Sequence, residues 1–183
     1  SLPTGKTPEY FIEWVRRALE RWDSAEGRLM REESGLTVDR RPDLSGLRFV
    51  QIDEFYPIDP RQHNSFYNYV QKYYVGGFGL DPKRGQFINC DEIPLPGGRR
   101  FTEVFADGAV DLGLRYREPK SRSEELQQQS IFMIDDWCAA YEQRIRDMGG
   151  IGFFLGGIGP DGHIAFNTRG SDPHSTMRLT HTN

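Results

Sequence analysis

The sequence lacks any apolar run of about 18 residues, the length that a membrane-spanning helix requires. Its first residues, SLPTGKTPEY, also lack the apolar centre of a secretory signal peptide. We therefore expect no membrane partner and a cytoplasmic location. Charge of one sign is missing too, since 23 Lys and Arg face 27 Asp and Glu along the chain. This balance argues against nucleic acid as a partner, although a local basic pocket is compatible with it.

Metal-ligating residues are few and scattered. The chain has two cysteines, Cys90 and Cys138, which are far apart and which we expect to be reduced, buried thiols. Beside His163 there are three other histidines, His63, His174 and His181, and none has the spacing of a ligand pair. The sequence therefore does not favour a metal site.

The chain of 183 residues is long enough for one domain with a real core, and no internal repeat is evident. Helical spacing of apolar residues predicts a helix after the loop 1–7, with Thr7 as its N-cap, Pro8 in its first turn and Trp14 and Trp22 on its buried face. Further helices are expected over 64–75, ended by the glycines that follow, and over 123–148. Short apolar runs predict strands over 47–52, 84–90 and 151–155, and residues 91–122 are expected to form a long loop.

Alternating helices and short strands are typical of an α/β fold with a mostly parallel sheet. In such sheets the binding crevice lies at the carboxyl ends of the strands. Three segments are expected there: Thr4-Gly5-Lys6-Thr7, the pair Asp53-Glu54, and the stretch GGIGPDGHIAFN over 156–167. The candidate site is therefore assembled from loops that are far apart in the sequence.

The segment Thr4-Gly5-Lys6-Thr7 offers backbone amides, two hydroxyls and an ammonium at a helix start, which suits a phosphate group. It lacks the spacing of a nucleotide P-loop, and an ordinary capped turn explains it equally well.

Asp53 and Glu54 follow a predicted strand, and two interpretations fit them. One is a solvated turn carboxylate or a helix N-cap. The other is a general base in the crevice, whose pKa burial would raise toward the working range.

The stretch 156–167 carries Asp161, Gly162 and His163. A carboxylate two residues from an imidazole orients the ring and tunes its basicity. The glycines let the backbone approach a ligand closely. A metal site or a plain turn is the alternative interpretation.

The motifs LPTGKTP, QIDEFY and GGIGPDGHIAFN, in this order and at these separations, closely resemble the glucosamine-6-phosphate deaminase (isomerase) family, whose wider relatives include the 6-phosphogluconolactonases. The resemblance covers Ser1 to about His181. It implies a three-layer αβα Rossmann-like fold and the conversion of glucosamine 6-phosphate, a small sugar phosphate, to fructose 6-phosphate and ammonia. It implies no redox cofactor and no catalytic metal.

The resemblance also implies roles for individual residues. Asp53 would move a proton between C2 and C1 of the sugar, and His163, supported by Asp161, would assist ring opening. The segment Thr4, Gly5, Lys6 and Thr7 would hold the 6-phosphate, and Gly157 and Gly159 would let the backbone approach the sugar. Arg178 resembles basic residues that serve the family's phosphate or effector sites.

The sequence departs from the family at Thr168, where members usually carry a glutamate that joins the Asp–His pair. Threonine carries no charge, so ring opening could be slower or the substrate could differ. Lys6 stands where many relatives have a small residue, and Arg169 adds a positive charge that suits an anionic substrate. Three alternatives to the deaminase therefore stay open: another sugar-phosphate isomerase, a lactonase, and a sugar-phosphate sensor without catalysis.

We expect residues 1–183 to form a single domain that is a piece of a longer protein, without its first strand and its C-terminal part. The polar insertions around 23–46 and 91–122 resemble a divergent branch, some of whose members appear with a second, deacetylase-like domain. The family tends to assemble, so a homo-oligomer is compatible with the resemblance.

Overall fold

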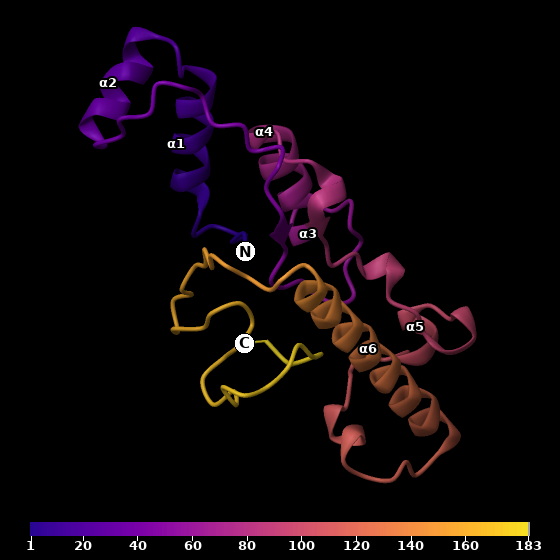
Figure 1. The fold of residues 1–183 in the computed structure, drawn as a ribbon. Helices are drawn as coiled ribbons and strands as arrows, with labels where there is room; N and C mark the ends of the chain where they lie inside the picture. The colour runs from indigo at the N-terminus through magenta and orange to yellow at the C-terminus, as the bar shows by residue number, and fades with distance from the viewer. Residues whose placement is uncertain (183) are drawn as a thin grey trace.

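The computed structural model describes residues 1–182. Helices dominate it, and its strands are short (Figure 1). In chain order the elements are α1 (Glu9–Glu20), α2 (Ala25–Glu33), β1 (Phe49–Val50), α3 (Phe66–Tyr69), the π-helix η1 (Val70–Val75), α4 (Gly76–Phe78), η2 (Pro82–Arg84), β2 (Gly85–Gln86), η3 (Cys90–Glu92), η4 (Pro96–Gly98), α5 (Phe101–Val104), η5 (Leu112–Arg115) and α6 (Arg122–Asp147).

The sheet is parallel, as the sequence predicts. Strand β1 pairs with β2, with Val50 opposite Gln86, and Leu2 forms a parallel bridge to Gln51 on the other side of β1. Both strands are shorter than the predicted ranges 47–52 and 84–90. The reason lies in Gln51, which is fully buried and whose side-chain amide bonds Asp53 O at 2.9 Å and Ile88 N at 3.0 Å. These side-chain bonds replace the next rungs of the ladder.

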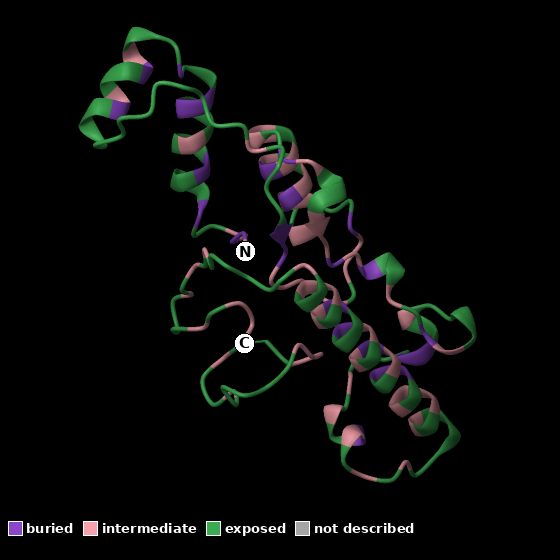
Figure 2. Ribbon diagram, in the orientation of Figure 1, coloured by how far each residue is buried: buried purple, intermediate pink, exposed green. Residues whose placement is uncertain are grey.

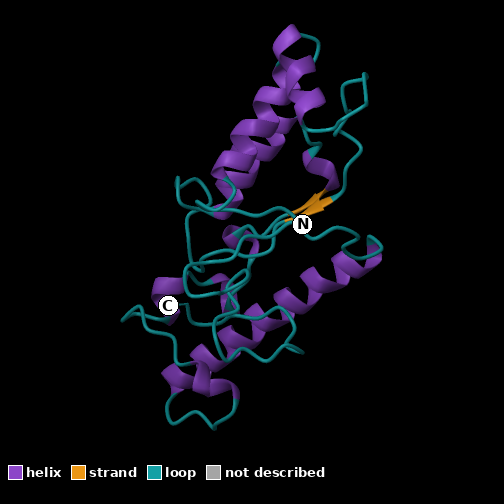
Figure 3. Ribbon diagram, turned by 90° about the vertical axis from the view of Figure 1, so that its left-hand side faces the viewer, coloured by secondary structure: helices purple, strands orange, loops and turns teal. Residues whose placement is uncertain are grey.

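Helices cover both faces of this sheet, which gives the expected α/β layering (Figure 3). On one face, Phe49 packs with Ile12 of α1 and with Val70 and Tyr74 of η1. Its neighbour Val50 points to the opposite face, toward α6.

Helix α6 crosses that second face and is joined to it by Tyr141. The Tyr141 hydroxyl lies 2.7 Å from Gln51 O and 2.8 Å from Gln86 O, so it bridges the ends of β1 and β2. The predicted apolar stripe of α6 is confirmed for Ile134, Cys138 and Tyr141, which are buried. The helix ends before Gly149 and Gly150, both at positive φ, as expected.

The first helix differs from its predicted form. Pro8, not Thr7, is the N-cap residue, and no side chain caps the helix. Trp22 is buried as expected, and its Nε1 donates to Asp39 O at 2.8 Å. Trp14, predicted to be in the core, is 43% exposed, because α1 turns Ile12 rather than Trp14 toward the sheet.

The second predicted helix is longer than expected. The helical run 66–78 passes through α3, η1 and α4 without a break, because Gly76 takes helical angles (φ −73°, ψ −40°). It ends only at Gly79, which adopts the left-handed conformation at φ 73°. Residues 91–122, expected to be one long loop, contain the short helices η4, α5 and η5.

The predicted strand 151–155 is wrong. Residues 151–154 are exposed and form no strand (Figure 2). The segment does lie next to the expected sheet position, since the Ser1 amino group donates to Phe153 O at 2.9 Å and Ser1 Oγ to Leu155 O at 3.0 Å. A strand needs a neighbour with a run of backbone partners, and these two bonds, from an amino group and a hydroxyl, are not rungs of a backbone ladder.

In residues 1–182, no helix combines the length and the apolar character that crossing a membrane requires.

Candidate active site

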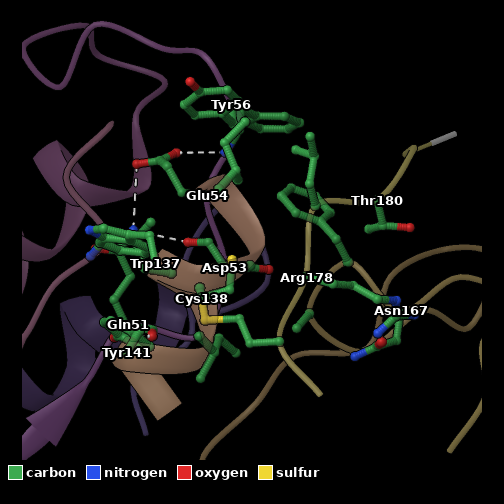
Figure 4. Close-up of a pocket in the computed structure, with 18 of the residues that line it drawn as sticks. Gln51, Asp53, Glu54, Tyr56, Trp137, Cys138, Tyr141, Asn167, Arg178 and Thr180 are labelled. Atoms are coloured by element: carbon green, nitrogen blue, oxygen red, sulfur yellow. Dashed lines mark hydrogen bonds between the residues drawn. The ribbon is translucent and has the colours of Figure 1, made fainter. Parts of the chain in front are cut away.

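Asp53 follows the end of β1 and faces a cavity that has a volume of about 640 Å³ (Figure 4). Thr4 Oγ1 donates a hydrogen bond of 3.3 Å to Asp53 Oδ1. Burial raises the pKa of the Asp53 carboxyl to about 6, and the negative charge of Glu54 acts in the same direction. The Thr4 hydrogen bond and the His163 imidazole oppose that rise. A carboxyl with this pKa exchanges protons near neutral pH, as a general base must.

Glu54 has a different place, although it is the next residue. Its carboxylate accepts hydrogen bonds from Phe66 N at 3.0 Å, Tyr67 N at 2.8 Å and Ser65 Oγ at 2.9 Å. These donors form the first turn of the helical run 66–78. Of the two interpretations that the sequence leaves open, the helix-capping one fits Glu54 and the base fits Asp53.

Asp161 and His163 form the pair that the sequence predicts. His163 Nδ1 lies 2.5 Å from Asp161 Oδ1, so the carboxylate fixes the orientation of the ring. The turn is closed by backbone bonds of 2.9 Å from Gly159 N to His163 O and from Gly162 N to Gly159 O. Gly162 takes φ 85°, a conformation that favours glycine. His163 is also close enough to Asp53 for its charge to lower the pKa of that carboxyl.

The stretch 156–167 is held beside Asp53 by aromatic packing. Phe166 lies with its ring centroid 4.7 Å from that of Phe55 and 5.7 Å from that of Phe66, on which it stacks. Phe55 follows Glu54, and Phe66 begins α3, so one aromatic cluster joins the motif, the loop after β1 and the start of the helical run. This cluster explains why a glycine-rich, charged loop is placed at this edge of the sheet.

The predicted phosphate loop contacts Asp53 but lies outside the cavity wall. Thr4 and Gly5 are half-buried, whereas Lys6 and Thr7 are exposed. Residues 4–7 are not among those that line the cavity. The structure therefore brings Thr4 to Asp53 and leaves Lys6 with its ammonium in solvent.

Gly157 and Gly159 both sit at close approaches within the protein. A Cβ on Gly157 would lie 2.8 Å from Thr7 Cβ, and one on Gly159 would lie 2.5 Å from His163 Nδ1. The first glycine therefore lets the motif pack on the predicted phosphate loop, and the second leaves room for the imidazole. The approach to a sugar stays a prediction for both.

Arg178 lines the cavity across from Asp53, on the segment 175–182 (Figure 4). This segment is held to α6 by Met177 N, which donates to Glu142 Oε1 at 2.5 Å, and to η5 by Arg115, whose Nη2 donates to Leu179 O at 2.8 Å. The structure brings Arg178 toward Asp53 but does not join it to Thr4, Gly5, Lys6 and Thr7 in one phosphate site.

Several residues that line the cavity are not predicted from the sequence. Tyr56, Phe101 and Trp137 give the cavity an aromatic side, and Asn167 adds an amide (Figure 4). Asn167 is the last residue of the stretch 156–167, and this place in the motif is the sequence signal that could identify it. The sequence shows Trp137 only as part of the apolar stripe of α6, because helical spacing does not distinguish a residue packed in the core from one that lines a cavity. In residues 1–182, no group of three or more His, Cys, Asp or Glu side chains is placed to hold a metal ion.

Curated proteins with which this chain shares sequence similarity include glucosamine-6-phosphate deaminases. No family model matches the chain. It is 54% identical over 93 residues to a glucosamine-6-phosphate deaminase of Caenorhabditis elegans, which covers 50% of this chain and 34% of the relative. It is 58% identical over 45 residues to the deaminase of Bacteroides fragilis, which covers 25% of this chain and 17% of that one. A deaminase 2 of Mus musculus is 60% identical over 42 residues, 23% of this chain and 15% of the relative. The matches therefore span at most about a third of these relatives.

One solved structure shares the fold over the whole chain. It is a monomeric glucosamine-6-phosphate deaminase described as a missing link of the NagB superfamily. The TM-score is 0.60 at 20% sequence identity, and the alignment covers 100% of this chain and 52% of that one. The chain thus corresponds to about half of the length of that solved structure. This likeness confirms the predicted α/β class.

Proposed function

We propose that this chain belongs to the glucosamine-6-phosphate deaminase family and converts glucosamine 6-phosphate and water to fructose 6-phosphate and ammonia. One observation carries the proposal: the carboxyl of Asp53 is buried at a cavity, has a pKa of about 6, and lies within electrostatic reach of the Asp161–His163 pair. A base and an oriented imidazole at one site are what an aldose–ketose proton transfer requires.

The residues divide the reaction between them. His163, oriented by Asp161, moves the proton that opens the sugar ring. Asp53 takes the proton from C2 and returns it to C1, with an enolamine between the two steps. Water then adds to the resulting imine carbon C2, and the nitrogen leaves as ammonia. Residues 4–7 lie outside the cavity wall but contact Asp53 through Thr4, and we assign the 6-phosphate to their amides and hydroxyls, with Lys6 supplying charge.

Two further features of the chain accord with this proposal. Arg169 follows Thr168 in an exposed turn, where a positive charge attracts an anionic substrate. Cys90 and Cys138 are free, buried thiols, which supports the cytoplasm as the place of action.

The experiment is ammonia release from glucosamine 6-phosphate by the full-length protein. We expect release by the wild type and a loss of at least about a thousandfold in Asp53→Asn and about a hundredfold in His163→Ala. Asp107→Asn and His174→Ala are matched controls, because both side chains are exposed and neither lines the cavity, and they should keep full activity.

Other outcomes contradict the proposal in distinct ways. Saturable binding of glucosamine 6-phosphate without ammonia release in any variant indicates a sensor. Hydrolysis of a phosphogluconolactone that survives Asp53→Asn indicates a lactonase. Recovery of turnover only in Thr168→Glu shows that the threonine has silenced the wild-type site.

A further inference from the structure

Glu54 joins the segment that carries Asp53 to the start of the helical run 66–78. Its Oε2 accepts hydrogen bonds from Tyr67 N at 2.8 Å and from Ser65 Oγ at 2.9 Å, and its Oε1 accepts one from Phe66 N at 3.0 Å. Ser65 is fully buried, so the shared bond is shielded from water. An ionised carboxylate that accepts several backbone N–H bonds at a helix start is held in one place.

The same carboxylate also contacts the end of the sheet. Gln51 Nε2 lies 3.4 Å from Glu54 Oε2 and 2.9 Å from Asp53 O, while Gln51 Oε1 accepts a bond from Ile88 N at 3.0 Å. Gln51 therefore holds the backbone of Asp53 (Figure 4), and the bonds from Ser65, Phe66 and Tyr67 hold the next residue at the helix. Between these two contacts, the Asp53 side chain lines the cavity and accepts the hydrogen bond from Thr4.

The charge of Glu54 acts on Asp53 as well. The groups that act on Asp53 come from each element around it: Glu54 on its own segment, Thr4 from the loop before α1, and His163 from the stretch 156–167. Burial is the largest cause of the raised Asp53 pKa, and Glu54 is the one of these groups that adds to the rise. Neutralising Glu54 therefore moves the pKa of Asp53 down.

We infer that Glu54 is a positioning residue for Asp53: its carboxylate fixes the strand end against the helical run 66–78 and presents the Asp53 side chain to the cavity. The inference rests on the proposed function in one respect, that Asp53 is the base of the reaction. A purely structural helix cap would stabilise the fold equally well but would leave the proton chemistry of Asp53 unchanged.

Two variants of the full-length protein separate the effect of the Glu54 charge from the effect of its side-chain length. Glu54→Gln keeps the length of the side chain and removes its charge. We expect the acidic limb of the pH profile of ammonia release to move to lower pH, and kcat to fall roughly tenfold or more as Asp53 loses its fixed direction. Glu54→Asp keeps the charge but is one methylene too short to reach Ser65 and Tyr67. Its kcat should fall about as far, while its acidic limb stays near the wild-type position.

The matched control is Glu103→Gln. Glu103 also accepts a backbone bond at a helix start, from Arg100 N at 2.7 Å, but it is exposed on α5. It should change neither kcat nor the pH limb. If the acidic limb of the pH profile stays in place in Glu54→Gln, the electrostatic part of the inference is overturned. If folded Glu54→Asp has the kcat of the wild type, the positioning part is overturned. The Glu54→Asp result tests the positioning role even if Glu54→Gln does not fold.

A titration of the Asp53 side-chain carboxyl carbon by NMR tests the same pair of variants without turnover. The midpoint should fall in Glu54→Gln and stay in Glu54→Asp. If the wild type releases no ammonia, the proposed function fails while this titration still decides the role of Glu54. An Asp53 midpoint that is the same in all three proteins contradicts the inference.

Discussion

Thr4 Oγ1 donates a 3.3 Å hydrogen bond to Oδ1 of Asp53, and this bond joins the loop before α1 to the loop after β1. The two residues are 49 positions apart in the sequence and come from adjacent parts of the parallel sheet. The bond stabilises the ionised form of Asp53, whereas burial favours the neutral form. The reactivity of this carboxyl is thus set by two opposed effects.

Removing the Thr4 hydroxyl should raise the pKa of Asp53 further. In Thr4→Val the side chain keeps its shape and the bond is lost, so burial acts with less opposition. The acidic limb of ammonia release should move to higher pH, which is opposite to the shift expected in Glu54→Gln. The measurement is kcat/KM across the pH range. Thr102→Val is the control, because Thr102 is exposed on α5, and a limb that stays in place in Thr4→Val contradicts the role assigned to the bond.

The same carboxyl should make stability depend on pH. The pKa of Asp53 is about 6 in the folded protein, whereas an aspartate in an unfolded chain has its ordinary pKa of 3.8, so the folded state binds this proton more tightly than the unfolded state does. Its stabilising contribution is complete below the unfolded pKa and is lost as pH rises through about 6. Asp53→Asn should therefore unfold less readily than the wild type at pH 8, by about 1–2 kcal/mol, and the difference should shrink toward pH 4.

Chemical denaturation at both pH values measures this difference. Asp59→Asn provides a contrast of opposite sign, since bonds from Arg61 lower the pKa of Asp59 to about 2. That variant should lose stability at neutral pH, and its deficit should shrink in acid. Equal effects of Asp53→Asn at pH 8 and pH 4 would contradict the raised pKa.

The position of Asp53 could be predicted from the sequence because a short apolar run ends directly before it. The role of Glu54 could not, because its partners Ser65, Phe66 and Tyr67 follow more than ten residues later and only the fold brings them back. A sequence pattern identifies an acidic residue at a strand end, but it does not tell a helix cap from a base. The distinction depends on which backbone amides are within reach.

The strand expected over 151–155 shows a second limit. Apolar composition predicts burial, yet a strand forms only where a neighbour offers a matching row of backbone groups. The pair Asp161–His163 could be predicted, because two residues separated by one glycine meet through local geometry. Their closeness to Asp53 depends on Phe166 stacking on Phe66, a contact between segments 100 residues apart that no local pattern indicates.

Tyr141 should be important for the stability of the sheet. Its hydroxyl is buried and lies between Gln51 O and Gln86 O, at the ends of β1 and β2. Tyr141→Phe removes the donor that these two carbonyls share, although Gln51 N still donates to Gln86 O, and it should lower the free energy of unfolding by about 1–3 kcal/mol. Tyr116→Phe is the control, because Tyr116 is 89% exposed. Urea denaturation of both variants measures the difference, and equal midpoints would contradict the bridging role of Tyr141.

Gly159 should be needed because it leaves room for the His163 ring, and not because the backbone there requires a glycine conformation. Its φ is not in the left-handed region, so alanine is tolerated by the chain, but a Cβ there would lie 2.5 Å from His163 Nδ1. The ring must move, and its bond to Asp161 must break. Gly159→Ala should therefore reduce ammonia release about a hundredfold while leaving the unfolding midpoint nearly unchanged.

Gly152→Ala is the matched control for this variant. Gly152 lies in the same loop region, and a Cβ there would meet nothing within 4 Å. It should keep wild-type activity and stability. An NMR titration of the His163 ring reports the displacement directly, because the ring signals of Gly159→Ala should differ from those of the wild type and those of Gly152→Ala should not. Full activity in Gly159→Ala would show that the observed orientation of His163 is not the one that catalysis uses.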